Sequence, residues 1–405
     1  MVVGQGYVGL PLAMALAKVG KRVFGVDVDL RRVRMLIEGK SPTPDVTSDD
    51  LKAVLRDEHY IPTQDFSVVR ESRVVIICVP TPLANDGQPD LNSLTLAISS
   101  IKEHVAPGTL IVSESTSYPG TLRWVHGQFL DLDFVKSLHF AVAPERINPS
   151  DHEWNLANTT RVIGAMHETS LMKAIELYSQ ICGKVIPVES PEIAEFAKLF
   201  ENTFRLVNIS LVNEMRELSQ VINVDFRKVL DAAETKPYGF MRFNPSAGVG
   251  GHCIPVDPMY LQYAFESEGV KSEFINLAMN QNRKTAHWIC NKVKSEMIKG
   301  KILIVGVAYK PNVGDTRESA ANEIASLLVK QGFEIRWIDS LVGAWDKYEQ
   351  WNEIERCNLA LVLVRHDSQS FQNILQNVDI VLDASGQMED KEKEFISEDL
   401  RIIRI

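Results

Sequence analysis

The feature that most constrains the fold is a glycine-rich turn between a short apolar strand and a helix near the start of the chain. Gly4, Gly6 and Gly9 have the spacing G-x-G-x-x-G, and the next apolar run ends at Asp27. The first two glycines allow a tight turn and close approach of a pyrophosphate, the third allows close helix packing, and the helix N-terminus supplies N–H donors. Asp27 is placed to accept hydrogen bonds from an adenosine ribose and to repel a 2′-phosphate. The pattern predicts a parallel α/β domain that binds NAD rather than NADP.

Two details belong to this motif. Arg32 lies one turn into the next predicted helix, within reach of an adenine phosphate. Only three residues precede Gly4, so the first strand is expected to be short, and a native start before Met1 is one explanation.

The composition narrows the class of protein. The chain has 405 residues, 45% of them hydrophobic and 24% charged, which is typical of a globular protein with two or three domains. A net charge of −10 disfavours a nucleic-acid partner. No apolar run reaches the roughly 18 residues of a membrane span, so no membrane partner is expected. Five cysteines without a C-x-x-C pair favour reduced thiols, a cytoplasmic location and no metal site.

Small polar residues follow two later strands of the same predicted sheet. Apolar runs at 74–79 and 109–113 are followed by Thr81 and Thr116. Ligands of open α/β sheets lie beyond the carboxyl ends of strands, so both threonines are candidates to face the cofactor. Ordinary helix capping by threonine is the alternative.

A third strand is followed directly by charged residues. Glu145 and Arg146 come after the apolar run that ends at Pro144, where they are placed either to serve the site or to form a solvated ion pair. Strands at 160–164 and 184–188 then complete the first domain.

Residues 191–221 have the pattern of one long helix. Lys198, Asn202 and Arg205 lie at i, i+4 and i+7, so they project from one face and would suit an oxyanion and a phosphate. Apolar side chains recur at helical spacing and predict a core helix, which over some thirty residues also suggests a central helix or a dimer surface. These apolar residues are Ile193, Phe196, Ala197, Phe200, Phe204, Val207, Leu211 and Met215. Helical segments continue to about 233 and again over 259–298.

A lone thiol lies in a loop rich in glycine and proline at 248–258. Unlike Cys78, which sits in an apolar strand, Cys253 has no apolar flank. The loop would present Cys253 either as a nucleophile or as an inert turn thiol. His252 is its neighbour in sequence, and adjacent side chains of an extended segment point to opposite sides, so we interpret His252 as structural.

A second α/β unit begins at Lys301. Its predicted elements are strands at 334–339, 359–364 and 378–383 and a helix at 319–331. Gly306-Val-Ala replaces the first glycine pair, which indicates a second nucleotide pocket without the full dinucleotide fingerprint. Arg317, just before the helix, is a candidate cofactor contact, whereas a favourable interaction with the helix dipole is the simpler interpretation of Glu318.

The predicted fold class is α/β, with two Rossmann-like doubly wound domains joined by a long central helix and a helical dimerisation region. The predicted domains are residues 1–189, which bind NAD, residues 190–298, which hold the cysteine loop, and residues 299–405, which bind a sugar nucleotide.

With these motifs in place, the chain resembles the UDP-glucose/GDP-mannose 6-dehydrogenase family over essentially its whole length. The motifs are GQGYVGLP at 4–11, VPTP at 79–82, EST at 114–116, KLFEN at 198–202, and GVGGHCIPVDP together with KPNVGDTRES. The resemblance implies oxidation of a sugar C6 hydroxymethyl group to a carboxylate with two NAD, through a thiohemiacetal and a thioester on Cys253. It also implies a homodimer and a nucleotide-sugar substrate.

The resemblance also implies residue roles. Lys198 and Asn202 would stabilise the C6 oxygen, and Asp257, Thr116 and Glu145 would position a water. The implied sugar-nucleotide contacts are Arg146, Ile147, Lys198, Asn202, Arg205, Lys236, Tyr238, Gly250, Tyr309 and Lys310. The implied NAD contacts are Tyr7, Val8, Asp27, Arg32, Thr81, Thr116 and Arg317, beside the glycines of the turn.

Two departures from the family bear on the substrate. Members that act on UDP-glucose usually carry a glutamate where this chain has Pro149, and the proline resembles the branch that acts on UDP-N-acetylhexosamines, although Ser150 replaces its usual glycine. We therefore expect UDP-GlcNAc or UDP-ManNAc, with UDP-glucose or dTDP-glucose as the alternative. The segment 383–386 also lacks a lysine or arginine that some relatives place in the sugar-nucleotide site.

Two other functions remain as alternatives. A hydroxy-acid dehydrogenase with a similar NAD domain would stop after one hydride transfer and would need no thiol. A regulator that binds NAD and a sugar nucleotide without catalysis would not need Cys253 or Lys198, and both are present.

Overall fold

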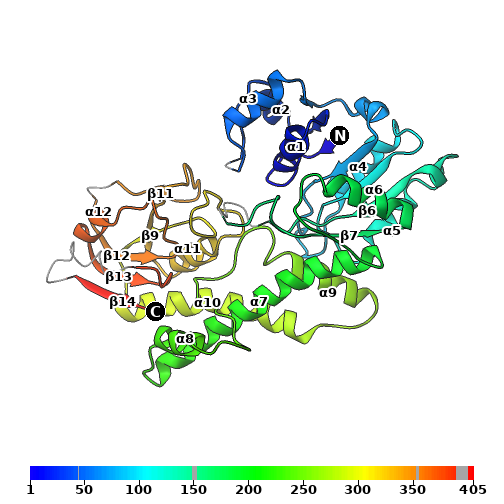
Figure 1. The fold of residues 1–405 in the computed structure, drawn as a ribbon. Helices are drawn as coiled ribbons and strands as arrows, with labels where there is room; N and C mark the ends of the chain where they lie inside the picture. Colours follow the sequence, from blue (N-terminus) through cyan, green and yellow to red (C-terminus); the bar gives the residue numbers. More distant parts are fainter. Residues whose placement is uncertain (44, 148–152, 353–354, 389–399) are drawn as a thin grey trace. The chain divides into compact units, whose positions relative to one another are not determined.

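The described chain divides into two compact units. The first comprises residues 1–201 and 259–270, and the second comprises residues 202–258 and 271–405. Each contains its own sheet (Figure 1). The computed structural model describes residues 1–43, 45–147, 153–352, 355–388 and 400–405.

The first unit is built on an eight-stranded sheet in the order β3-β2-β1-β4-β5-β6-β7-β8. The β6–β7 pair is antiparallel and the other pairs are parallel. The strands are β1 (Val2–Val3), β2 (Val23–Val26), β3 (Tyr60–Thr63), β4 (Val74–Ile77), β5 (Leu110–Ser113), β6 (His139–Val142), β7 (Arg161–Ala165) and β8 (Val185–Pro187).

Helices cover this sheet, and the central strands are buried on both faces, which explains their continuous apolar runs. The helices are α1 (Gly9–Lys18), α2 (Leu30–Ile37), α3 (Ser48–Arg56), α4 (Asn92–Lys102), α5 (Thr121–Gly127) and α6 (Glu168–Tyr178), with the 3₁₀ turns η1 (Phe66–Glu71) and η2 (Val135–Ser137).

The strand order places the predicted cofactor residues. Strand β1 lies between β2 and β4, so the direction of winding reverses between β1 and β4. Ligands of such sheets bind beyond the carboxyl ends of the strands at that point. The glycine turn follows β1, Thr81 follows β4, and Thr116 follows β5, so all belong to this edge of the sheet.

The second unit contains a six-stranded, fully parallel sheet in the order β11-β10-β9-β12-β13-β14. The prediction of a second parallel α/β domain is confirmed, and with it the fold class. The strands are β9 (Lys301–Val305), β10 (Glu334–Ile338), β11 (Glu349–Gln350), β12 (Cys357–Val362), β13 (Val378–Asp383) and β14 (Arg401–Arg404), and the helices after β9 and before β13 are α11 (Ala320–Lys330) and α12 (Gln372–Gln376).

Long helices make up the middle of the chain. Helix α7 (Pro191–Val221) has the predicted bounds, and α8 (Phe226–Glu234) follows it. The prediction that the apolar stripe of α7 is buried in a core is wrong for Phe196, Phe200 and Leu211, which are exposed. The predicted helical region at 259–298 is two helices, α9 (Asp257–Ser267) and α10 (Glu273–Glu296), because Gly269 with φ 77° turns the chain between them. In the described parts of the chain, no helix is both long and apolar enough to cross a membrane. The predicted domain boundaries stay a prediction.

Candidate active site

The glycine turn after β1 has the shape that a pyrophosphate requires. Gly4 adopts φ 87°, and a Cβ there would collide with the carbonyl oxygen of Cys78 on the neighbouring strand. A Cβ on Gly9 would collide with the carbonyl of Gly4, so the helix can approach the turn only with glycine at this position. A Cβ on Gly6 would meet no heavy atom within 4 Å, and α1 begins without a side-chain cap. Open space therefore lies beside an uncapped helix N-terminus, and the turn fits NAD.

Asp27 is the anchor of this turn. Its carboxylate accepts hydrogen bonds from the backbone N–H of Gln5 at 2.8 Å and of Asp29 at 2.9 Å. Arg32 donates to the same carboxylate at 2.8 Å, so its first partner is Asp27. The expected phosphate contact of Arg32 stays a prediction, as do the cofactor contacts of the exposed Tyr7 and of Val8, which precedes α1.

The two predicted threonines are brought together. Thr81 Oγ1 donates to the carbonyl oxygen of Thr116 at 2.7 Å, which joins the loops after β4 and β5. Ser115 Oγ donates to the carbonyl of Val79 at 2.8 Å and adds a second link between them. Neither threonine caps a helix in these contacts, so the alternative interpretation as helix caps is wrong here.

Glu145 and Arg146 do not pair with each other through their charges. Arg161 Nη2 donates to Glu145 at 2.9 Å, while Arg146 forms a bidentate pair with Glu201. The second Glu145 oxygen accepts the backbone N–H groups of Arg146 and Ile147 at 2.6 and 2.7 Å. Burial alone would raise the pKa of Glu145, but the Arg161 guanidinium and these N–H groups outweigh it and hold the pKa below its usual range. The alternative of a solvated ion pair is therefore wrong. Glu145 is a largely buried carboxylate that fixes its own loop by accepting hydrogen bonds from the loop backbone.

The residues that stabilise the Glu145 carboxylate were not predicted from the sequence. Arg161 and Glu114 are buried beneath it, and Arg161 Nη1 also donates to the carbonyl of Pro144 at 3.0 Å. Burial raises the pKa of Glu114 to about 7, although the neighbouring Arg161 opposes the shift. Tyr178 donates to Glu114. Charged residues directly at the ends of apolar strands were the available signal.

The cysteine loop in the second unit exposes one sulfur. All five cysteines are described, and Cys253 is exposed whereas Cys182, Cys290 and Cys357 are buried and Cys78 is half-buried. Cys253 lies four residues before the start of α9 at Asp257, and its carbonyl accepts the backbone N–H of Asp257 at 2.8 Å. The expectation of a presented thiol is therefore consistent with the structure.

Close packing fixes the loop ahead of this sulfur. A Cβ on Gly250 would lie 2.5 Å from the carbonyl oxygen of Glu318 and 2.9 Å from Tyr309 Cβ. Gly251 has φ 83°, and a Cβ there would lie 2.7 Å from the Tyr309 ring. Gly251 N–H also donates to the carbonyl of Arg317 at 3.2 Å. The segment 309–318 is therefore the bed on which the cysteine loop lies.

Two further contacts stabilise the loop from the helices. Asn282 on α10 accepts the backbone N–H of Val249 at 2.8 Å. Asn202 on α7 donates from Nδ2 to Asp257 at 2.5 Å, so the structure brings these two predicted residues together. Lys198, on the same helix, belongs to the first unit.

The remaining predicted contacts lie at several places in the second unit. Arg205 is exposed on α7. Lys236 Nζ lies 5.0 Å from the ring centre of Tyr238, and Lys310 Nζ lies 5.9 Å from that of Tyr309.

Arg317 pairs with Asp315, its neighbour in the bed of the cysteine loop. His252 is exposed, and desolvation and then the charge of Arg317 lower its pKa, while its interpretation as structural stays a prediction. Pro149 and Ser150, on which the substrate branch was argued, lie outside the described residues.

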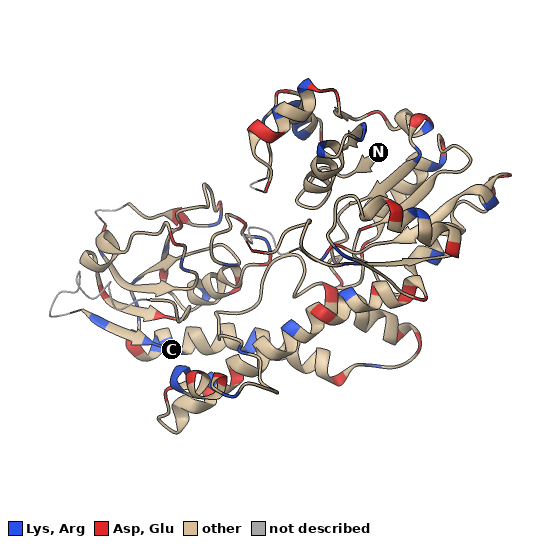
Figure 2. Cartoon of the chain, viewed as in Figure 1, with Lys and Arg blue, Asp and Glu red and all other residues tan. Residues whose placement is uncertain are grey.

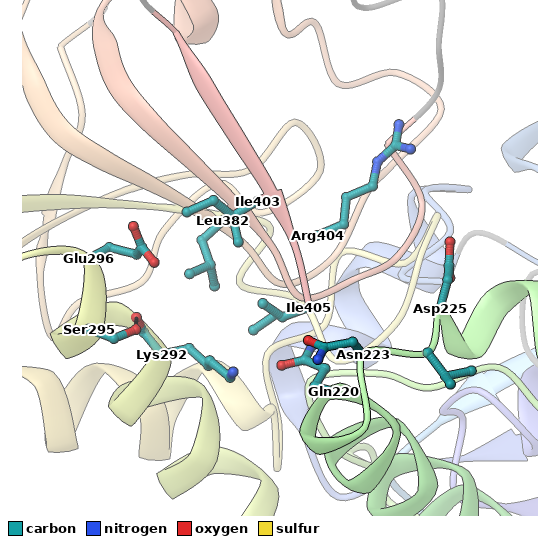
Figure 3. A pocket seen from close by; sticks show the side chains of 11 residues that line it. Gln220, Asn223, Asp225, Lys292, Ser295, Glu296, Leu382, Ile403, Arg404 and Ile405 are labelled. Atoms are coloured by element: carbon teal, nitrogen blue, oxygen red, sulfur yellow. Dashed lines mark hydrogen bonds between the residues drawn. The ribbon is translucent and has the colours of Figure 1, made fainter.

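The second unit also has a surface cavity away from these residues. Its volume is about 450 Å³, and it lies between the C-terminal parts of α7 and α10 and the ends of β13 and β14 (Figure 3). The lining mixes both signs of charge, from Lys292, Arg404, Asp225 and Glu296. Figure 2 likewise shows acidic and basic residues mixed along the elements of each unit.

Comparison with known proteins identifies one family along most of the chain. Models of the UDP-glucose/GDP-mannose dehydrogenase family match residues 1–182 as its NAD binding domain, 192–284 as its central domain and 303–389 as its UDP binding domain. The UDP-N-acetyl-D-mannosamine dehydrogenase of Methanocaldococcus jannaschii is 35% identical over 381 residues, which cover 90% of this chain and 85% of that protein. The UDP-N-acetyl-D-glucosamine 6-dehydrogenase of Pseudomonas aeruginosa is 32% identical over 366 residues, which cover 86% and 84%.

A solved structure agrees over the full length. The UDP-D-ManNAc dehydrogenase of Pyrococcus horikoshii superposes with a TM-score of 0.88 at 28% identity and covers 100% of this chain and 99% of its own. The glycine turn, the exposed thiol and the three matched domains thus agree, and the chain belongs to the UDP-glucose/GDP-mannose dehydrogenase family.

Proposed function

We propose that this NAD-dependent dehydrogenase oxidises the C6 hydroxymethyl group of a UDP-N-acetylhexosamine to a carboxylate, with Cys253 as the nucleophile. The observation that carries this proposal is the exposed Cys253 sulfur on a loop fixed by glycine packing. A simple hydroxy-acid dehydrogenase needs no such thiol, and a regulator without catalysis would not require one.

Bound NAD would accept a hydride in each of two oxidations, one from the alcohol and one from a covalent adduct. The Cys253 sulfur would attack the aldehyde carbon, forming a C–S bond while the carbonyl oxygen takes a proton. Loss of a hydride from carbon and of the hydroxyl proton from this thiohemiacetal leaves a thioester. Water then adds to the thioester carbon, the C–S bond breaks, and the acid and the free thiol are released.

The polar residues predicted for the site are given matching roles in this proposal. Asn202 donates to Asp257 at 2.5 Å, so the amide is fixed by a buried carboxylate at the start of α9. A fixed amide stabilises negative charge on the C6 oxygen better than a mobile one, because no reorganisation is needed during the reaction. We assign the same task to Lys198 and the positioning of water to Asp257, Thr116 and Glu145.

Assignment of the substrate branch follows the relatives. Proteins at 35% and 32% identity are named for UDP-N-acetyl-D-mannosamine and UDP-N-acetyl-D-glucosamine. Pro149 in the sequence supports the same branch. UDP-glucose and dTDP-glucose are the alternative substrates.

The decisive experiment counts NADH formed per sugar consumed. UDP-ManNAc, UDP-GlcNAc, UDP-glucose and dTDP-glucose would be offered in parallel to the wild type, to Cys253→Ala and to the control Cys182→Ala, which removes a buried thiol instead. We expect two NADH per sugar on a UDP-N-acetylhexosamine, no turnover by Cys253→Ala and near-normal turnover by the control. One NADH per sugar, or acid formation by Cys253→Ala at the full rate, would refute the covalent mechanism.

We further propose that the protein acts as a cytoplasmic homodimer. In the second unit, α7 and α10 pack together through a hydrogen bond from Ser210 Oγ to the carbonyl of Ala278, at 2.9 Å. Apolar side chains nevertheless remain exposed on both helices, among them Leu211, Leu218 and Leu277. A second copy of this face would bury them. Light scattering of Leu211→Glu should report a monomer where the wild type is a dimer, and a monomeric wild type would contradict the proposal.

A further inference from the structure

Beneath the bed of the cysteine loop lies a histidine and aspartate pair to which the sequence analysis gave no role. His366 follows β12 and is fully buried, and its Nε2 lies 3.0 Å from Asp339 Oδ1. Its Nδ1 accepts the backbone N–H of Asn312 at 2.8 Å. A ring nitrogen that accepts an N–H carries no proton, so the imidazole proton is on Nε2, which lies close to the carboxylate without a hydrogen bond of good geometry to it.

Asp339 ties this pair to the turn after β9. One of its oxygens accepts the backbone N–H groups of Val307 and Ala308 at 2.8 and 3.1 Å, and the other accepts those of Leu341 and Val342 at 2.9 and 3.0 Å. Burial would raise the pKa of Asp339, but His366 and the backbone donors outweigh it and hold the pKa below its usual range. The carboxylate is therefore a fixed charge with both oxygens occupied.

Asn312 also connects the segment 309–318 to Asp367, an exposed residue. Its side chain donates to Asp367 at 2.8 Å and accepts the Asp367 backbone N–H at 3.0 Å, and its backbone has φ 61°. The loop is closed by the Tyr309 N–H, which donates to the carbonyl of Asp315 at 2.9 Å. The segment 309–318 thus rests on His366 at Asn312, and the cysteine loop packs on both of its ends, on Tyr309 at one and on Arg317 and Glu318 at the other.

We propose that His366 is a positioning residue: together with Asp339 it fixes the segment 309–318 and thereby the place of Cys253. This inference rests on the proposed role of Cys253 as the nucleophile. His366 touches neither substrate nor cofactor in this assignment. It acts through Asn312 and Tyr309, because a shift of the bed moves the glycines that pack on it.

The test compares His366→Gln with His287→Gln, which changes an exposed histidine on α10 in the same unit. Glutamine retains a donor toward Asp339 but cannot accept from Asn312 at the same time. A displacement near 1 Å lowers rates by about a hundredfold, so kcat/KM for the sugar nucleotide should fall by about that factor in His366→Gln. The rate of Cys253 alkylation by iodoacetamide should change at least about threefold, while the NAD dissociation constant stays within about twofold, because NAD binds the first unit.

A second variant covers the case in which His366→Gln does not fold. Asn312→Gly keeps the backbone donor and suits the positive φ, but it loses both contacts with Asp367. We expect a fall of about fivefold in kcat/KM and a changed alkylation rate, in proportion to a smaller displacement. Unchanged kcat/KM and alkylation in Asn312→Gly, or in a folded His366→Gln, would overturn the inference. The alkylation rate needs no substrate, so it tests the inference even if the proposed sugar oxidation fails.

Discussion

In both units the first strand of the sheet ends in a glycine with positive φ, and the next strand ends in a buried aspartate. Gly4 has φ 87° and Gly306 has φ 79°, and a Cβ on either would collide with a carbonyl of the neighbouring strand. Asp27 and Asp339 each hold the turn through backbone N–H groups. The two turns are therefore built alike.

Their surroundings differ. Helix α1 begins at Gly9, inside the first motif, and Arg32, beside Asp27, is partly exposed. Helix α11 begins only at Ala320, after the segment 309–318, and fully buried His366 covers Asp339.

The difference decides what each turn can bind. A helix that starts at the turn leaves its N-terminal N–H groups for a ligand, as a pyrophosphate requires. In the second unit, the segment 309–318 separates the turn from α11 along the chain, and the cysteine loop packs against this segment. The same local geometry serves as a cofactor cradle in one unit and as a scaffold in the other.

Substitution of Gly4 and of Gly306 should have the largest effect on stability. A small effect would contradict the structural likeness of the two turns. Gly306→Ala should destabilise the protein by about 3 kcal/mol, since it combines a strained positive φ with a backbone clash. Gly4→Ala should do the same and also abolish NAD binding. Thermal unfolding and NAD titration measure both effects.

Gly332→Ala separates strain from clash, because Gly332 has φ 89° but a Cβ there would meet nothing within 4 Å. It should cost only about 1 kcal/mol. A loss in Gly306→Ala no greater than this would contradict the steric account.

Substitution of the two aspartates, Asp27 and Asp339, should have the next largest effect and should show that the two turns have different roles. Asp27→Asn should weaken NAD binding by about tenfold, because the charged hydrogen bond predicted between Asp27 and the ribose would be lost, whereas Asp339→Asn should leave NAD binding within about twofold and destabilise the fold by about 2 kcal/mol. Isothermal titration and urea unfolding provide the measurements. Equal effects of both variants on NAD binding would refute the distinction.

The dependence of the free energy of unfolding on pH, at low pH, provides a further test of Asp339. The folded pKa of Asp339 lies below its unfolded value of 3.8, so its contribution is complete above that pH and is lost as the pH falls through the folded pKa. Urea unfolding of Asp339→Asn should therefore show a smaller loss of stability on acidification below that value than the wild type does.

The smallest effect should come from Arg32→Gln. The Arg32 side chain is partly exposed, so its pair with Asp27 should contribute about 0.5 kcal/mol or less to stability. NAD binding should weaken about threefold if the guanidinium also reaches a phosphate, as a charge-assisted contact at a solvated site. A change of about a hundredfold would instead mean that Arg32 and not Asp27 anchors the adenosine.

Prediction from sequence worked where the signal was local and periodic. The bounds of α7 agree because Pro191 starts it and an apolar stripe continues through it. The glycine turn and its acid are fixed by short-range sterics. The helical region predicted at 259–298 is helical, but the break at Gly269 was not predicted, although glycine is a helix breaker and was visible in the sequence.

Contacts between distant residues could not be read in the same way. Glu145 was compared with its neighbour Arg146, yet the cation that pairs with Glu145 is Arg161, and the carboxylate that pairs with Arg146 is Glu201 on α7. The pairing of Asn202 with Asp257 likewise depends on tertiary packing. Residue types at the site were predictable, whereas their partners were not, because nothing in local spacing encodes which charges share a buried volume.

Four of the five cysteines are not exposed, so a thiol-reactive label should react with the folded protein at a single residue. Burial raises the pKa of Cys78, Cys182, Cys290 and Cys357, and only Cys253 among the five, all of them described, is exposed. A maleimide dye should attach to the folded protein at one position, and peroxide should oxidise that position first. In a cell under oxidative stress, the sulfur proposed to carry the chemistry is thus the first to be lost, and output of the uronic acid would fall before the fold does.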